Sequence, residues 1–140
     1  MDGISEILAT YNCVSLDEKI QFELDGVVEK EIKQAYCIEN LEFCVSCMDY
    51  TTLKVSDTEE SVKNFTADLL KKLKKFNLRD VAAVCVFSNY AGIVREGLKG
   101  TEIQTAVVAG NFPNSQTFTE IKLAECKMAI GAGAQEVDVV

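Results

Sequence analysis

Three short, predominantly apolar runs constrain the fold of this chain more than any other feature. They cover residues 81–87, 103–109 and 136–140; the first run is hydrophobic throughout, and each of the other two contains only two polar residues. Strands that are buried on both faces, as in a parallel sheet, have this pattern. We therefore expect three buried parallel strands in these runs.

Helical patterns lie between these runs. Residues 45–53 form another short apolar segment, rich in Thr and Tyr, which predicts one further strand ahead of the three. Helices are expected over about 56–76, 89–98 and 117–131, where apolar residues recur every three or four positions. This alternation predicts an α/β fold with right-handed parallel crossovers. Four such strands can form an open sheet or half of an eight-stranded barrel.

Two short motifs predict where the helices over 56–76 and 117–131 begin. Ser56 with Glu59, and Thr117 with Glu120, have the spacing of a capping box, in which a hydroxyl and a carboxylate bind free backbone N–H groups. The apolar periodicity of the last helix predicts an inward face. Its members are Phe118, Ile121, Ala124 and Met128.

Residues 1–46 are acidic and helical in pattern. Their apolar residues give a helix of moderate amphipathicity, and they include Ile20, Phe22, Leu24, Val27, Val28 and Ile32. No motif in this segment carries evident chemistry. We expect an N-terminal helical extension over 1–46, followed by the strand-containing part over 47–140.

Charge and composition exclude several kinds of function. The 140 residues include 14 Lys and Arg, 22 Asp and Glu and no His, so the net charge is −8. An acidic chain without a basic stripe is a poor partner for nucleic acid or an anionic membrane. Without His, neither a His-dependent nucleophile nor a His-metal site can form. The sequence shows no secretory signal pattern and no membrane-spanning run, and we expect a cytoplasmic protein.

The six cysteines are spread through apolar segments, which favours reduced structural residues. Only Cys44 and Cys47 have the spacing of a metal or redox pair. A zinc site would need a second pair or a His, and a thioredoxin-type pair would open a helix rather than lead into a strand. No metal site is expected.

Two carboxylates, Asp49 and Asp138, lie inside apolar strand segments. Burial of an unpaired carboxylate costs free energy of folding, so we expect each aspartate either to have a bonding partner or to serve a function. At the end of a parallel strand, a buried carboxylate with a raised pKa can transfer protons. The alternative is a strand-end aspartate that faces solvent or caps a helix. Gly110 and Asn111 could donate backbone N–H groups to a substrate oxygen, or simply form a turn.

Five segments resemble the first half of the deoxyribose-phosphate aldolases, in order and with matching gaps. They are Asp49-Tyr50-Thr51-Thr52-Leu53 with residues 57–60, the run 81–87, Asn111-Phe112-Pro113, Ala124-Glu125, and residues 133–140. The resemblance implies a partial (βα)8 TIM barrel of parallel strands one to four, preceded by the helical extension.

The same resemblance implies a class I aldolase that forms a Schiff base with its substrate and needs no metal or other cofactor. Such enzymes reversibly cleave 2-deoxy-D-ribose 5-phosphate to acetaldehyde and D-glyceraldehyde 3-phosphate. Asp138 would be the catalytic, proton-handling residue. Asp49, Thr51, Leu53 and Cys85 would lie at the substrate pocket.

The chain also departs from the family pattern. The Schiff-base lysine and the glycine-rich phosphate loops belong to later strands of the family, and the usual Tyr-Pro after strand two reads Phe87-Ser88. We therefore expect no aldolase activity from this chain alone, and self-association through open barrel edges. Two alternatives are a non-catalytic acidic interaction or regulatory module, and a flavodoxin-like small-molecule binder with helices on both faces of its sheet.

Overall fold

The computed structural model describes residues 3–10 and 13–140, which divide into two compact units at Leu41 and Glu42. The first unit is helical, as predicted. It contains α1 (Gly3–Thr10), α2 (Cys13–Val27), the π-helical turn η1 (Val28–Ile32), α3 (Lys33–Ala35) and the start of α4 (Ile38–Ser46). None of the side chains described in residues 3–41 is buried, so this segment forms no core of its own.

The second unit contains the predicted alternation of strands and helices. After α4 come β1 (Asp49–Thr51), α5 (Glu59–Phe76), β2 (Ala83–Phe87), the 3-10 turn η2 (Ser88–Tyr90), α6 (Ala91–Gly97), β3 (Gln104–Ala109), α7 (Thr119–Gly131) and β4 (Glu136–Val139). The four strands pair in the order β1-β2-β3-β4, and every pair is parallel. The strand expected within 45–53 is shorter than predicted, because residues 45 and 46 end α4.

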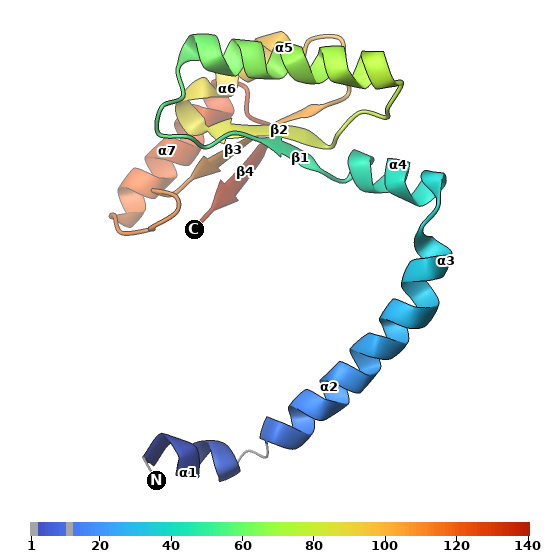
Figure 1. The fold of residues 1–140 in the computed structure, drawn as a ribbon. Coiled ribbons are helices and arrows are strands. Elements are labelled where there is room, and N and C mark those ends of the chain that lie inside the picture. The colour runs from blue at the N-terminus through green and yellow to red at the C-terminus, as the bar shows by residue number, and fades with distance from the viewer. Residues whose placement is uncertain (1–2, 11–12) are drawn as a thin grey trace. The chain divides into compact units, whose positions relative to one another are not determined.

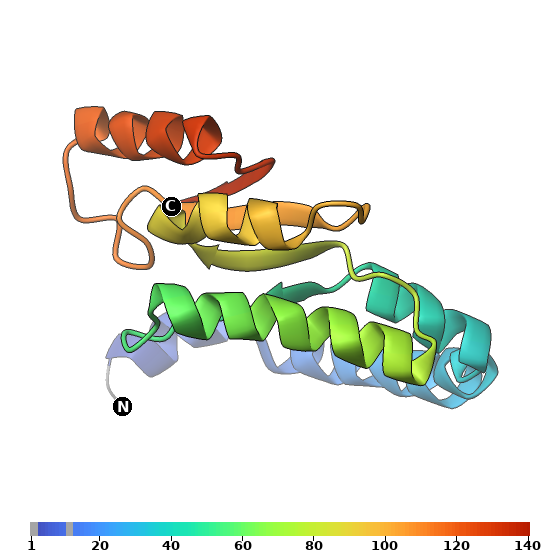
Figure 2. The same cartoon turned by 90° about the horizontal axis from the view of Figure 1, so that it is seen from above.

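The helices α5, α6 and α7 cover one face of this sheet (Figures 1 and 2). On that covered face, strand residues such as Val84 and Val107 are buried together with Leu69 of α5 and Val94 of α6. The opposite, open face has its own small cluster, made of Ala83, Cys85, Ala106 and Val108. Helices on one face only are typical of a barrel, whose interior is lined by strands. The arrangement is that of a partial α/β barrel and differs from a flavodoxin-like sheet covered on both faces.

Both predicted helix starts are wrong by a few residues. The N-cap of α5 is Thr58, whose hydroxyl accepts from Ser61 N at 3.2 Å while Ser61 Oγ accepts from Thr58 N at 2.8 Å. A serine hydroxyl thus takes the place of the carboxylate that the Ser56 motif offered. In α7 the N-cap is Phe118, without a side-chain hydrogen bond. The capping boxes at Ser56 and Thr117 are therefore not formed.

The predicted inward face of α7 is also wrong. Phe118 is 79% exposed and Met128 is 75% exposed, and both Ile121 and Ala124 are exposed as well. The buried residue of this helix is Ala129. Apolar side chains occur all around α7, so their spacing does not define a single inward face.

Candidate functional site

The strand register places the predicted site residues on the open face of the sheet. Asp49 pairs with Ala83, Thr51 pairs with Cys85, and Asp138 pairs with Val108. Register partners in a parallel sheet point to the same face, and Ala83, Cys85 and Val108 all belong to the open-face cluster. Leu53, which follows β1, packs against the same cluster. Residues from three strands, separated by up to 89 positions in the chain (138 − 49), thus share one surface.

The two aspartates lie at different heights along the strands. Asp49 is the first residue of β1, level with Ala83 at the start of β2. Asp138 is level with Val108, which in turn is level with Phe87, the last residue of β2. Asp138 is therefore nearer the carboxyl end of the sheet, where barrel enzymes carry their chemistry.

Cys85 lies between the two carboxylates and is only 3% exposed. Burial, the largest cause, and the negative charges of Asp138, Asp49 and Glu136 together raise the pKa of its thiol to about 11, whereas a hydrogen bond with Thr51 opposes the shift. The thiol is consequently protonated at neutral pH.

Glu136 is a member of the site that the sequence interpretation missed. It pairs with Ala106, which pairs with Cys85, so its side chain is on the open face. The signal was available, because Glu136 stands two residues before Asp138 and alternate strand residues share a face. The open face thus carries three carboxylates around one buried thiol.

The expected burial of the aspartates is not observed. Asp49 and Asp138 are both exposed. The physical reason is that no layer of the described residues covers the open face, so only the small cluster between the strands is shielded from solvent.

Hydrogen bonds connect the loops at the carboxyl ends of β1 and β2. Within the first loop, Asp57 Oδ2 accepts from Thr52 Oγ1 at 2.8 Å and from Lys54 N at 2.9 Å. Tyr90 then donates its hydroxyl to Asp57 O at 2.7 Å. The loop after β1 is therefore shaped internally and tied to the turn that follows β2.

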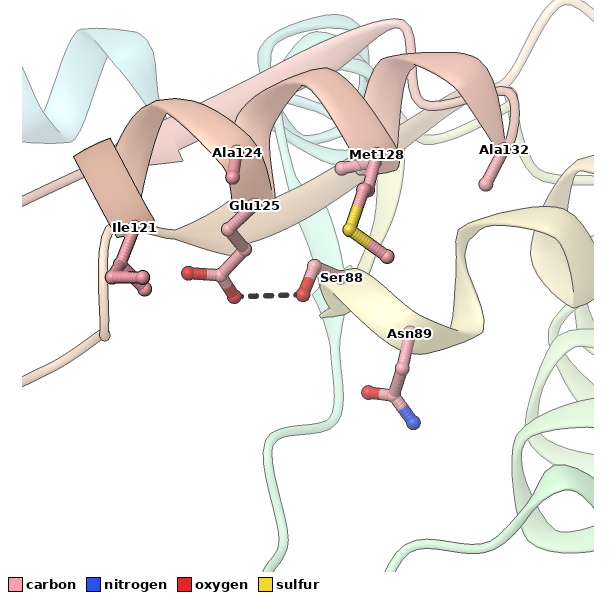
Figure 3. A pocket seen from close by; sticks show the side chains of 8 residues that line it. Ser88, Asn89, Ile121, Ala124, Glu125, Met128 and Ala132 are labelled. Carbon is pink, nitrogen blue, oxygen red and sulfur yellow. Dashed lines mark hydrogen bonds between the residues drawn. The ribbon is translucent and has the colours of Figure 1, made fainter.

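Glu125 of α7 connects the loops after β2 and β3. Its carboxylate accepts from Ser88 Oγ at 2.8 Å, from Gly110 N at 2.9 Å and from Asn111 N at 3.1 Å. Figure 3 shows this side chain directed from α7 toward Ser88. Burial alone would raise the pKa of the carboxyl, but the bonds from Ser88, Asn111 and Gly110 outweigh it and lower the pKa. The Gly110 and Asn111 amides thus already have an acceptor, which argues against the predicted role on a substrate oxygen.

A cavity of about 610 Å³ lies on the helix side of the sheet, between η2 and α7. Ser88, Asn89, Ile121 and Met128 are among its lining residues, and Figure 3 shows them. Cys85 and the aspartates do not line it. The cavity is therefore separate from the open-face site.

Cys44 ends up within α4 and Cys47 just after it, and both thiols are exposed. Cys37, Cys85 and Cys126 are likewise free thiols, whereas Cys13 is in the part of α2 whose side chains are not described. Within residues 3–10 and 13–140, no three Cys, Asp or Glu side chains gather as metal ligands would. None of the described helices has the length and hydrophobicity needed to cross a membrane.

No protein-family profile matches the chain, but individual curated proteins do. The deoxyribose-phosphate aldolase of Clostridium novyi is 43% identical over 93 residues, which are 66% of this chain and 38% of that protein. The deoxyribose-phosphate aldolase of Bos taurus is 35% identical over 134 residues, covering 86% of this chain and 40% of that protein. The chain thus spans about two fifths of the length of these relatives.

Solved structures that resemble this chain are described as aldolases of the same kind. A crystal structure described as a putative deoxyribose-phosphate aldolase from Coccidioides immitis matches 70% of this chain and 36% of its own, with 26% identity and a TM-score of 0.59. The tetrameric deoxyribose phosphate aldolase of Aeropyrum pernix matches 70% of this chain and 38% of its own, with 28% identity and a TM-score of 0.56. Over the part that it spans, the chain is therefore a homologue of the deoxyribose-phosphate aldolases, a family of lyases, and its sheet corresponds to part of their α/β barrel.

Proposed function

We propose that this chain forms the N-terminal half of a class I deoxyribose-phosphate aldolase. The complete enzyme would reversibly cleave 2-deoxy-D-ribose 5-phosphate to acetaldehyde and D-glyceraldehyde 3-phosphate through a Schiff base, without a metal. The observation that carries the proposal is the convergence of Asp49, Cys85 and Asp138 on the helix-free face of a parallel sheet that resembles such enzymes.

In this proposal Asp138 is the catalytic residue that takes up and returns a proton, because it is an exposed carboxylate toward the carboxyl end of the strands. Asp49, Thr51 and Leu53 line the substrate side of β1. Cys85 contributes a protonated thiol, which is a weak donor and a poor nucleophile. Since the open face is acidic, the phosphate of the substrate would be bound by the rest of the barrel.

The lysine that forms the Schiff base would also come from outside this half. None of the four strands formed by the described residues contains a lysine. A nucleophilic lysine needs a desolvated setting that lowers its pKa, and strand interiors of a barrel supply one. We therefore expect the chain alone to be inactive.

Fragment complementation tests the function. The chain is mixed with the remaining part of the Clostridium novyi relative, cut after the residue that aligns with Val140, and aldolase turnover and borohydride trapping with acetaldehyde are measured. We expect turnover and a trapped adduct on the added half only. In the same assay Asp138→Asn removes turnover, whereas the matched control Glu102→Gln, an exposed residue before β3, retains it. Turnover by this chain alone, or full activity with Asp138→Asn, contradicts the proposal, and a complex without turnover favours a non-catalytic module.

We also propose that the isolated chain self-associates through its sheet edges. β1 and β4 each have one neighbour in the sheet, so their outer edges present unpaired N–H and C=O groups. The description of the Aeropyrum pernix enzyme as tetrameric supports assembly in a relative. Light scattering at micromolar concentration tests it, and a monodisperse monomer counts against it.

We propose that residues 47–140 supply the barrel strands, that residues 1–46 are an added helical extension, and that the protein works in the cytoplasm. The free thiols of the five described cysteines support a reducing compartment. Localisation of a tagged full-length chain by fluorescence tests the last point.

A further inference from the structure

Glu125 makes contacts that the proposed chemistry does not use. It is half-buried on α7, and its two carboxylate oxygens accept hydrogen bonds from two different loops. One oxygen accepts from Ser88 at the end of β2, and the other accepts from both Gly110 and Asn111 at the end of β3. One side chain thus joins the ends of two neighbouring strands.

The backbone at these two amides is shaped for an anion. Gly110 has φ +79° and Asn111 has φ +62°, both in the left-handed region. Both N–H groups are directed at a single carboxylate oxygen, and successive amides in turn conformations form anion-binding concavities. The anion here is part of the protein, so the loop conformation and the Glu125 charge stabilise each other.

The end of β4 lies close against Gly110. A Cβ at this position would lie 2.9 Å from Val140 O and 3.1 Å from Val139 Cγ1. Lys122 Nζ, also on α7, donates to Val140 O at 3.0 Å and contacts Ser115 Oγ. Val140 stands two residues after Asp138, so a contiguous set of contacts leads from Glu125 through Gly110 to the strand that carries Asp138.

We propose that Glu125 is a positioning residue that sets the carboxyl ends of β2, β3 and β4 relative to one another and thereby places Asp138 with respect to Cys85. Its catalytic meaning rests on the proposed aldolase function, whereas its structural effect does not. It acts through backbone amides and touches no reacting atom.

The first test uses NMR on the full chain. We expect the amide proton shifts of Gly110 and Asn111 to titrate with the same midpoint as the Glu125 carboxyl carbon. In Glu125→Gln, exchange of these two amides should speed up about tenfold or more, since the charge-assisted acceptor is lost. Glu120→Gln, an exposed residue in the first turn of the same helix, is the matched control and should change neither amide.

The second readout reports on the site itself. The Cys85 thiol senses the Asp138 charge, so we expect the pH profile of Cys85 alkylation to move to lower pH in Glu125→Gln and to stay in place in Glu120→Gln. Glu125→Asp, which keeps the charge, should restore part of the amide protection. In the complemented enzyme, Glu125→Gln should lower kcat by about tenfold.

Two results overturn the proposal: amides of Gly110 and Asn111 that stay protected in Glu125→Gln, or that fail to titrate with Glu125 in the unmodified chain. The titration needs no variant, so an unfolded Glu125→Gln does not remove the test. A complemented barrel without aldolase activity would refute the proposed function and leave the amide result standing.

Discussion

The two faces of the same four-stranded sheet differ sharply. On the covered face, Val84, Val86 and Val107 are fully buried against helices. On the open face, the small residues Cys85 and Ala106 are shielded, but the carboxylates at the strand ends are exposed. Alternate residues of one strand therefore have different roles. One set forms the hydrophobic core with the helices, and the other set carries the proposed chemistry.

The sharpest test of this contrast is an aspartate on the covered face. Val107→Asp places a carboxylate among apolar side chains without a partner, so we expect a loss of about 4 kcal/mol or more in the free energy of unfolding, enough to prevent folding. Asp138→Asn on the open face should change it by less than about 0.5 kcal/mol. Urea unfolding followed by circular dichroism measures both. Equal losses would remove the distinction between the faces.

A cavity in the helix layer should cost somewhat less. Leu69 of α5 is 3% exposed, whereas Phe76 of the same periodic pattern is 61% exposed. We expect Leu69→Ala to cost about 2–5 kcal/mol and Phe76→Ala less than about 1 kcal/mol. The same urea titration compares the two variants. A larger loss for Phe76→Ala would mean that this end of α5 is packed in solution.

Thiol chemistry tests the open face. Because burial and the nearby carboxylates raise the pKa of Cys85 to about 11, we expect alkylation at pH 8 to be about a hundredfold slower at Cys85 than at the exposed Cys44 and Cys47. Since the folded-state pKa is raised, Cys85 stabilises the fold below the ordinary thiol pKa, and this contribution is lost as the pH rises toward 11. Peptide mass spectrometry after timed iodoacetamide treatment gives the three rates. Similar rates would show that the sheet opens readily.

The smallest expected effect concerns the start of α5. Thr58→Ala removes the observed cap and should cost about 1 kcal/mol, whereas Ser56→Ala should cost only a few tenths. Ser56→Ala removes one hydroxyl, and Thr58→Ala removes one hydroxyl and an exposed methyl group, so their unfolding midpoints can be compared. If Ser56→Ala is the more damaging one, the capping box suggested by the sequence spacing is the one formed in solution.

Parallel pairing could be predicted from the sequence because the mainly apolar runs 81–87, 103–109 and 136–140 alternate with helical patterns, and strand order followed from the family resemblance. The common face of Asp49, Cys85 and Asp138 followed from strand alternation and from the family resemblance. Local ambiguity explains the missed cap, since Ser56 with Glu59 and Thr58 with Ser61 both have a suitable spacing.

Other features depend on partners far away in the chain. Nothing near Gly110 in the sequence indicates that its backbone N–H donates a hydrogen bond to Glu125, 15 residues later. The exposure of Met128 and of the two aspartates depends on whether other helices or strands pack over them. The spacing of apolar residues within one segment does not show whether such elements are present. Periodicity therefore located the elements better than it located their burial.

The hydrogen bond from Tyr90 to Asp57 has a practical consequence for protein engineering. A loop grafted from a relative in place of residues 52–58 would arrive without the partner that its own turn after β2 provided. Such an exchange should succeed only when donor and acceptor segments are transplanted together. The loop after β1 and the turn after β2 therefore depend on each other and should be exchanged together.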